Sequence, residues 1–303
     1  MRIFNATETA ALLPYPALVA QLANTMPEYA AEQIHSPERQ VIPLNNGGVL
    51  LSMPASAKDI AIHKLVNVCP TNQAINLPTI HGLVNAFDPN TGAPLFSLDG
   101  PTVTGRRTAA VTCLAIKTLL ATPPSVVRLI GTGTQSKSHA EAIATMFPEA
   151  TLLIASRNEE AASAFIQTMA AVGVTVAAAQ QHPLNEAADV VITLTTSKTP
   201  IYDEAPSANR LVIGVGAFQP TSAEVSAKVV NASELVVDDL HGAKEEAGDI
   251  ILAGSDWQQV KALASYLNQP APTGRPIFFK SVGSAAWDLA AGRVAAAQLA
   301  SVA

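Results

Sequence analysis

The segment from residue 126 to residue 157 constrains the fold more than any other part of the chain. It begins with the apolar run VVRLI (126–130), passes through the glycine turn 131–136 into a helical pattern, and reaches a second apolar run, TLLIA (151–155). Strand, tight turn, helix N-terminus and second strand, in this order, are typical of a dinucleotide-binding unit. The sequence therefore predicts an α/β fold here, with a dinucleotide site at the turn.

Single positions in the glycine turn have separate physical roles. Gly131 permits the tight turn, and Gly133 lets the backbone approach a pyrophosphate without a Cβ in the way. Ser136 is small enough for helix and strand to pack closely. The helix N-terminus offers free N–H groups and the positive end of its dipole to the phosphates. We therefore predict cofactor contacts at Gly131, Thr132, Gly133, Thr134 and Gln135.

The end of the second strand indicates which dinucleotide is bound. An NAD site usually has Asp or Glu there to bind the ribose 2′-OH, but this strand is followed by Ser156, Arg157 and Asn158. A hydroxyl and a guanidinium suit a 2′-phosphate, which arginine binds through paired hydrogen bonds. The sequence favours NADPH, and NADH is the alternative if Arg157 is only a solvated residue at a strand end.

The chain after residue 125 alternates apolar runs with helical segments or loops. Runs such as VVITL and LVIGV are apolar throughout, as strands buried on both faces should be. This alternation predicts a doubly wound parallel sheet. The expected strands are 126–130, 151–155, 174–178, 189–194, 211–215 and 234–238.

The chain before residue 122 has a different texture. The first 30 residues have helical spacing, with Thr7 as a candidate cap. Turn residues at 88–92 predict a hairpin, and a helix is expected over 104–120, after Asp99-Gly100-Pro101 ends the sheet. Prolines 123 and 124 mark the best domain boundary. The expected strands are 49–53, 59–66, 82–87 and 94–98.

Composition excludes several classes of function. The chain has 303 residues, of which 49% are hydrophobic, and a net charge of −6 without a basic stripe, so nucleic acid is not an expected partner. Cys69 and Cys113 are too few for a disulfide framework, and we interpret them as buried thiols. Glu245, Glu246 and Asp249 are interpreted as an exposed charged turn, so no metal is expected. Without a signal peptide or a long apolar span, we expect a cytoplasmic protein and no membrane partner.

Charged residues in apolar surroundings are the candidates for catalysis. Lys64 lies in DIAIHKLV, where a strand would place it on the same face as two isoleucines, although an edge strand could carry it without function. Arg106 and Arg107 open the expected helix, one pointing inward and the other to solvent. With Arg39 they suit a small carboxylate substrate. His81 is ambiguous, because a core histidine bonded to a carbonyl is the simpler interpretation.

Several segments together resemble the ornithine cyclodeaminase/μ-crystallin family. They extend over nearly the whole chain in the family's order. A single segment would be weak evidence, but the whole set is specific for the family. They are SPERQVIPL (36–44), HKLVNV (63–68), NLPTIHGLVNAFDPNTGAPL (76–95), DGPTVTGRRTAAVT (99–112), GTGTQSKSHAEA (131–142), IGVGAFQP (213–220), VVDDLHGAKEEAGDI (236–250) and FKSVGSAAWDLAAG (279–292).

The resemblance implies a homodimer whose substrate-binding and dimerisation domain, a smaller α+β domain, comprises 1–121 and 284–303. A Rossmann NAD(P)-binding domain would comprise 122–283. Lys64 matches the family's active-site lysine and Arg107 its carboxylate-binding arginine, with Arg39 as a second arginine and His81 as a possible substrate contact. The remaining implied cofactor contacts are Ser156, Arg157, Thr195, Val215, Ser281 and Gly283.

One departure from the family pattern concerns the branch. Ornithine cyclodeaminases carry an aspartate after the glycines of a VGG segment, where this chain has Ala217. The resemblance is therefore to the ketimine reductase branch, which implies NAD(P)H-dependent reduction of Δ1-pyrroline-2-carboxylate, with Δ1-piperideine-2-carboxylate also possible. The alternatives are an alanine-dehydrogenase-like or N-alkylamino-acid-forming reductase, an NADPH-dependent binding protein, and ornithine cyclodeaminase itself.

Overall fold

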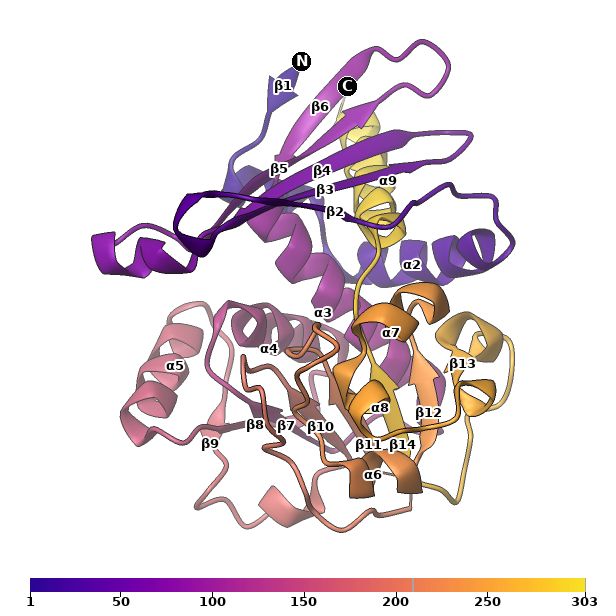
Figure 1. Cartoon of the computed structure of the whole chain (residues 1–303). Coiled ribbons are helices and arrows are strands. Elements are labelled where there is room, and N and C mark those ends of the chain that lie inside the picture. Colours follow the sequence, from indigo (N-terminus) through magenta and orange to yellow (C-terminus); the bar gives the residue numbers. More distant parts are fainter. Residues whose placement is uncertain (209, 303) are drawn as a thin grey trace. The chain divides into compact units, whose positions relative to one another are not determined.

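The computed structural model describes residues 1–208 and 210–302 and divides into two compact units (Figure 1). The first contains Met1–Arg107 and the residues from Ser284 on, and the second contains Thr108–Gly283. The first boundary falls inside a helix, ahead of the proline pair where the sequence analysis placed it. The roles assigned to the two ranges stay a prediction.

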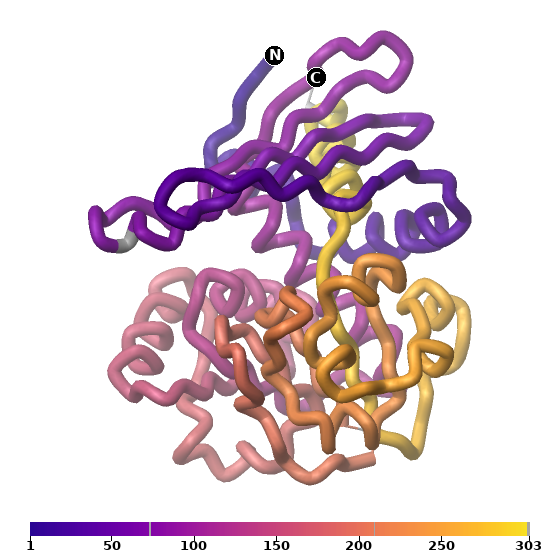
Figure 2. Tube along the Cα trace, in the orientation of Figure 1, coloured from indigo at the N-terminus to yellow at the C-terminus, as the bar shows by residue number. Residues whose placement is uncertain are grey.

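The first unit is a sheet with helices packed on one face. Among the described residues the sheet has six strands in the order β1-β6-β5-β4-β3-β2. The C-terminal helix α9 (Ala285–Val302) contacts β3, β4 and β5, and α2 (Tyr15–Ala30) packs on α9, as the trace in Figure 2 shows. The strands are β1 (Arg2–Ile3), β2 (Gln40–Pro43), β3 (Val49–Ser56), β4 (Ala61–Val68), β5 (Ile80–Phe87) and β6 (Pro94–Asp99).

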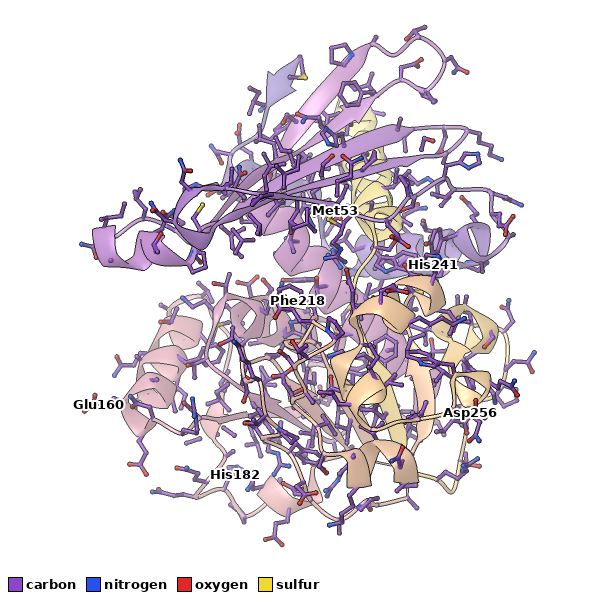
Figure 3. All side chains as sticks on the ribbon, in the orientation of Figure 1. Met53, Glu160, His182, Phe218, His241 and Asp256 are labelled. Atoms are coloured by element: carbon purple, nitrogen blue, oxygen red, sulfur yellow. The ribbon has the colours of Figure 1, made fainter. Side chains whose placement is uncertain are left out.

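Side chains along β4 alternate between the two faces of this sheet. Ile62, Lys64 and Val66 are buried, whereas the residues between them are half-buried. Lys64 pairs in register with Met53 of β3, labelled in Figure 3, and with Val84 of β5. Because β4 has a neighbour on each side, the edge-strand interpretation of Lys64 is wrong.

Two helix starts differ from the sequence prediction. Asn5, rather than Thr7, caps α1 (Ala6–Leu12) in a reciprocal capping box with Glu8. Helix α3 (Gly100–Leu119) begins directly after β6, four residues before the expected start, because Asp99 Oδ1 accepts a hydrogen bond from the Thr102 N–H at 2.8 Å. An aspartate followed by Gly-Pro thus opens the helix here.

The second unit confirms the α/β fold with a parallel Rossmann-type sheet. Its eight strands have the order β13-β12-β14-β11-β10-β7-β8-β9 in the described part of the chain, and every neighbouring pair is parallel. The strands are β7 (Val126–Ile130), β8 (Thr151–Ala155), β9 (Ala177–Ala178), β10 (Val190–Thr193), β11 (Leu211–Gly214), β12 (Glu234–Val237), β13 (Lys261–Ala262) and β14 (Ile277–Lys280). The helices are α4 (Thr134–Met146), α5 (Glu159–Ala171), α6 (Ala227–Ala232), α7 (Leu240–Glu246) and α8 (Gly248–Leu252).

One central strand of this sheet was not predicted from the sequence. β14 lies between β11 and β12, and all four of its residues are buried. Its apolar run, IFF, is short and ends on a lysine, unlike the run LVIGV that identified β11. None of the helices in the described ranges is long and apolar enough to cross a membrane.

Candidate active site

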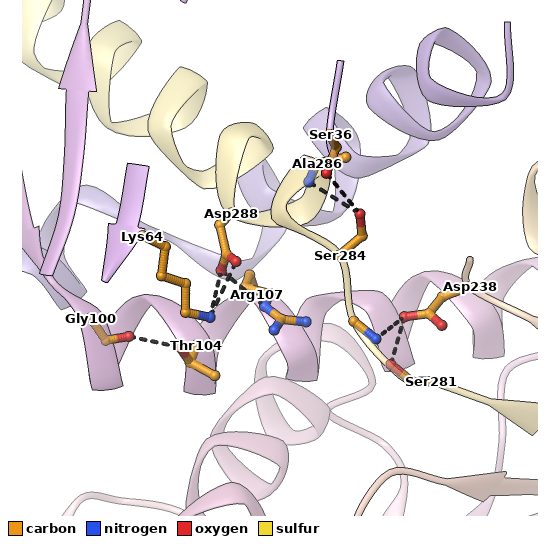
Figure 4. A network of polar contacts seen from close by, with 11 residues as sticks. Ser36, Lys64, Gly100, Thr104, Arg107, Asp238, Ser281, Ser284, Ala286 and Asp288 are labelled. Atoms are coloured by element: carbon orange, nitrogen blue, oxygen red, sulfur yellow. Dashed lines mark hydrogen bonds and ion pairs between the residues drawn. The ribbon is translucent and has the colours of Figure 1, made fainter. Parts of the chain in front are cut away.

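Three ionisable side chains meet in the interior of the first unit (Figure 4). Lys64 Nζ donates to both carboxylate oxygens of Asp288, each at 3.2 Å, and Arg107 Nε donates to Oδ1 at 3.2 Å. The side chains of Lys64 and Asp288 are 4% and 0% exposed. The cluster therefore has two cations for one anion in a place that water scarcely reaches.

Each member of the cluster comes from a different element. Lys64 lies on the inward face of β4, Arg107 on the first turns of α3, and Asp288 on the first turn of α9. Regular spacing on each element fixes these directions, so the cluster exists only when the C-terminal helix packs on the sheet. A buried cluster with an excess positive charge is costly unless an anion joins it, and it thus favours an anionic ligand.

Burial controls the protonation of Lys64. The pKa of its ammonium group is lowered from 10.5 to about 8, and desolvation is the largest cause. The negative charge and hydrogen bonds of Asp288 oppose this shift, whereas the positive charges of Arg107 and Arg39 add to it. A lysine with a pKa near 8 can both hold and release a proton close to neutral pH.

The other predicted substrate residues differ in whether they lie near the Lys64 cluster. Arg39 lies just before β2, half-buried, and is close enough to Lys64 to affect its pKa. Arg106 stacks on Tyr15 at 3.9 Å from the ring centre and donates to a backbone carbonyl, so it is the structural member of the arginine pair. His81 is exposed, and its register puts it on the sheet face opposite Lys64. The structure does not bring His81 into the cluster.

The glycine turn of the second unit has the shape that a pyrophosphate requires. Gly131 has φ +114°, and a Cβ there would lie 2.8 Å from the Leu194 carbonyl oxygen. A Cβ on Gly133 would meet open space, and Gly133 directly precedes the first turn of α4. The hydroxyl of Ser136 and the side-chain oxygen of Gln135 are buried without a described partner. An open approach to a helix N-terminus fits a dinucleotide phosphate.

The residues after β8 divide into two kinds. Arg157 is exposed, and its side chain is available to a ligand. Asn158 caps α5 by accepting from the N–H groups of Glu160 and Ala161 at 2.8 and 3.1 Å. The Ser156 hydroxyl accepts from the Asn158 N–H at 3.2 Å. The segment therefore has an ordered backbone and one free guanidinium at the strand end.

The remaining cofactor candidates lie at the same edge of the sheet, because parallel strands end together. Thr195 and Val215 follow β10 and β11, and Ser281 and Gly283 follow β14. Asp238, at the end of β12, accepts from the Ser281 hydroxyl at 2.9 Å and from the Gly283 N–H at 3.0 Å (Figure 4). The predicted cofactor residues of this unit are thus brought to one edge.

Three carboxylates in these regions escaped the sequence analysis. Asp288 is the single acid of a mostly apolar helix, which was a usable signal. Asp238 is the last residue of a predicted strand, and ligand-site residues concentrate at such strand ends. Glu224 lies in a loop segment with nothing unusual in its sequence, and it is fully buried.

The interpretation of Asp249 as part of an exposed turn is wrong. Asp249 is 1% exposed, and its Oδ2 lies 2.7 Å from Nζ of Lys280, which is fully buried. Its other oxygen accepts two backbone N–H groups, from Glu224 and Val225. Asp249 therefore stabilises buried backbone and a buried lysine. Within the described ranges, no group of histidines, cysteines and acids could hold a metal ion.

Comparison with known proteins agrees with these observations. The model of the ornithine cyclodeaminase/mu-crystallin family matches residues 4–300. The chain belongs to this family. Among its curated members, a Delta(1)-pyrroline-2-carboxylate/Delta(1)-piperideine-2-carboxylate reductase of Azospirillum brasilense is 54% identical over 97% of this chain and 94% of that protein.

Solved structures of the family share the fold. The Delta(1)-pyrroline-2-carboxylate reductase of Thermococcus litoralis, in complex with NADH and L-proline, superposes with a TM-score of 0.87 at 24% identity, over 97% of this chain and 96% of that one. An archaeal alanine dehydrogenase dimer with bound NAD gives a TM-score of 0.85 at 25% identity, over 97% and 94% of the two chains.

Proposed function

We propose that this protein is an NADPH-dependent reductase of cyclic imine acids that converts Δ1-pyrroline-2-carboxylate to L-proline. Δ1-Piperideine-2-carboxylate, which would give L-pipecolate, is a second substrate. The observation that carries the proposal is the buried cluster in which Lys64 and Arg107 share one carboxylate, Asp288. One curated relative that is 54% identical is named for both imine acids, and two more at 54% identity are named for Δ1-pyrroline-2-carboxylate, which supports the choice of substrate.

Binding of the substrate carboxylate falls to arginine. Asp288 engages Arg107 through Nε, so the two terminal nitrogens of the guanidinium remain for a second carboxylate. Such a planar fork binds a carboxylate in two parallel hydrogen bonds and fixes its orientation. Arg39 adds positive charge on the same side, since it acts on Lys64. The carboxylate anchor in turn fixes the position of the imine carbon.

Lys64 holds the proton that the reaction consumes. When bound, a nicotinamide cofactor would supply the hydride that reduces the imine carbon, and the imine nitrogen then needs one proton to become the product amine. Lys64, with its pKa lowered to about 8, can donate that proton directly or through water. Asp288 then stabilises the protonated lysine before each turnover and orients Nζ.

Arg157 and Ser156 select the phosphorylated cofactor. No acid stands at the end of β8 to bind a ribose 2′-OH, and Arg157 is exposed and positively charged. A guanidinium at this strand end favours a 2′-phosphate. NADH remains usable, since the glycine turn and helix N-terminus bind the pyrophosphate that both cofactors share.

The protein acts as a homodimer through the open face of the first sheet. Leu65 and Leu83 are paired in register on the face opposite Lys64, as are Ile42 and Leu50. Leu83 is 41% exposed and Ile42 48% exposed. An apolar sheet face of this kind suits a second copy of the chain. The related archaeal alanine dehydrogenase, which is a dimer, supports this assembly.

The experiment that tests the function is a spectrophotometric screen of NADPH and NADH oxidation. Five- and six-membered cyclic imine acids should both be reduced, whereas pyruvate with ammonia or methylamine should react poorly. Release of ammonia from ornithine without net cofactor oxidation would instead identify a cyclodeaminase, which Ala217 argues against. Tight NADPH binding without oxidation by any of these substrates would indicate a binding protein and overturn the proposal.

A further inference from the structure

The carboxylate of Glu224 joins the ends of two neighbouring strands in the second unit. It is fully buried. Its Oε1 accepts from the backbone N–H and the hydroxyl of Thr195 at 2.6 and 2.7 Å. Its Oε2 accepts from the N–H groups of Gly216 and Ala217 at 2.7 and 3.0 Å, and from the Thr193 hydroxyl at 3.1 Å. One side chain therefore ties the loop after β10 to the loop after β11.

These two loops belong to one half of the cofactor site. The glycine turn follows β7, and the 2′-phosphate candidates follow β8, so β7 and β8 serve the pyrophosphate and the adenine end. The sheet continues on the other side of β7 with β10 and β11. In a doubly wound sheet the dinucleotide extends across this change of direction, and its second half lies beyond the strands of the opposite side. The loops held by Glu224 are thus at the nicotinamide end.

The approach of the two loops leaves no space for another arrangement. A Cβ on Gly216 would lie 2.0 Å from the Thr195 carbonyl oxygen, so only glycine fits at that position. Buried backbone N–H groups at loop ends need acceptors, and Glu224 supplies them for three residues at once. Without the carboxylate, the N–H groups of Thr195 and Ala217 would lose their acceptor, and the N–H of Gly216 would keep only a long bond to the Thr193 carbonyl oxygen at 3.3 Å.

Glu224 is itself fixed from behind. Oδ1 of Asp249 accepts from the N–H groups of Glu224 and Val225 at 2.7 and 2.8 Å, and its Oδ2 pairs with Lys280 of β14. The carboxylate of Glu224 receives five donors and faces no acceptor in these contacts. It therefore acts as a fixed acceptor of hydrogen bonds from both loops.

We propose that Glu224 is a positioning residue that preorganises the nicotinamide end of the cofactor site. The inference rests on the proposed function, because it assumes a nicotinamide dinucleotide as the ligand. Because both loops are held before binding, the nicotinamide half of the cofactor can bind without the entropic cost of ordering them. Binding of the adenine half does not depend on these loops. Loss of the carboxylate should therefore weaken binding of the nicotinamide half and leave binding of the adenine half unchanged.

Glu224→Gln is the direct test, because the amide nitrogen would point a donor at N–H groups that need an acceptor. Titration calorimetry with NADP⁺ and with 2′,5′-ADP, which lacks the nicotinamide half, separates the two ends. We expect the affinity for NADP⁺ to fall about tenfold or more, and the affinity for 2′,5′-ADP to change less than about twofold. Equal changes for the two ligands, or none, would overturn the inference.

Asp189→Asn is the matched control. Its carboxylate also accepts two backbone N–H groups, from Ser125 and Val126 at 2.7 and 3.0 Å, but at the amino end of β7. This variant should bind both ligands as the wild type does. The wild type could bind NADP⁺ but reduce no imine acid, while Glu224→Gln loses affinity for NADP⁺ and not for 2′,5′-ADP. In that case the proposed function fails and the role of Glu224 stands.

Hydrogen exchange on the unaltered protein gives a second measurement that does not depend on the folding of a variant. The amides of Thr195, Gly216 and Ala217 should already be protected without cofactor, because the carboxylate holds them. Exchange at the rate of an open loop, with protection appearing only when NADP⁺ is added, would show that the cofactor orders these loops and would overturn the inference.

Discussion

Lys64 Nζ lies 3.2 Å from each carboxylate oxygen of Asp288, although 224 positions separate the two residues in the chain. Both side chains are buried in the first unit. Asp288 favours the charged form of the lysine, and burial together with Arg107 opposes it. The balance brings the pKa of Lys64 to about 8, which puts its protonation within reach of an activity measurement.

The first prediction concerns the alkaline limb of the pH profile. If the protonated Lys64 is the proton donor, kcat/KM should fall as pH rises through about 8, because the acid form is lost above its pKa. Lys64→Met should lower kcat about 100-fold or more, the usual contribution of a positioned acid, and should abolish this limb. Near-normal turnover in the variant would exclude the lysine as donor.

Asp288→Asn shows whether the alkaline limb of kcat/KM comes from Lys64 or from titration of the substrate imine. Removing the carboxylate removes the charge and hydrogen bonds that raise the pKa of Lys64, so that pKa should drop below 8. The alkaline limb of kcat/KM should therefore move to lower pH. A limb that stays in place in this variant belongs to the free substrate or to another group.

The second prediction uses adjacent arginines as a matched pair. Arg107→Lys should raise KM for the imine acid about tenfold and change kcat less, because a point charge replaces a planar fork that grips the carboxylate. Arg106→Lys should leave KM unchanged and lower stability by about 1 kcal/mol, since it weakens the stacking on Tyr15. Steady-state kinetics and thermal unfolding of both variants test this. A rise of KM in both would contradict the assignment.

Local patterns were enough for the parts of the fold that depend on periodicity. The alternation around Lys64 predicted its face of the strand, and the alternation of apolar runs with helical segments after residue 125 predicted the parallel sheet. Asp288 could not be found this way, because its partners come from two distant elements. β14 was missed for a similar reason: its four residues are buried by tertiary packing and carry no period long enough to read.

Burial of charge was the other limit of the sequence. Glu224 and Asp249 occur in polar stretches where acids are ordinarily solvated, which is why Asp249 was assigned to the surface. Glu224 accepts backbone N–H groups that follow two strands, and Asp249 accepts the backbone N–H groups of Glu224 and Val225, so both acids are buried where the backbone needs acceptors. A strand end is visible in the sequence, but the distant residue that satisfies its donors is not.

The third prediction concerns cofactor choice. Arg157→Ala should reduce kcat/KM for NADPH by about 10- to 100-fold and leave the value for NADH nearly constant, since only the 2′-phosphate loses a charged partner. The side chain is exposed, so stability should not change. Kinetics with both cofactors measure the ratio. An equal loss with the two cofactors would contradict a role in 2′-phosphate binding.

The fourth prediction concerns the open face of the first sheet. Leu83→Glu would put a charge on the half-exposed face opposite Lys64 and should shift the protein from dimer to monomer, because a buried unpaired carboxylate is costly at an apolar interface. Val172→Glu, on an exposed residue at the end of α5, is the control for an added charge. Sedimentation should give a dimer for the control, and a monomeric wild type would reject the assembly.

The fifth prediction concerns the buried pair behind Glu224. Lys280→Met should lower the free energy of unfolding by about 3–5 kcal/mol, because it leaves the carboxylate of Asp249 buried without its cation. Asp249→Asn should also be destabilising, but the double variant should lose less than the sum of the two, since neither charge is then left alone. Urea unfolding of the three variants measures this coupling. Additive losses would mean that Lys280 and Asp249 act independently, and that the cation does not help to fix the carboxylate that holds the backbone of Glu224.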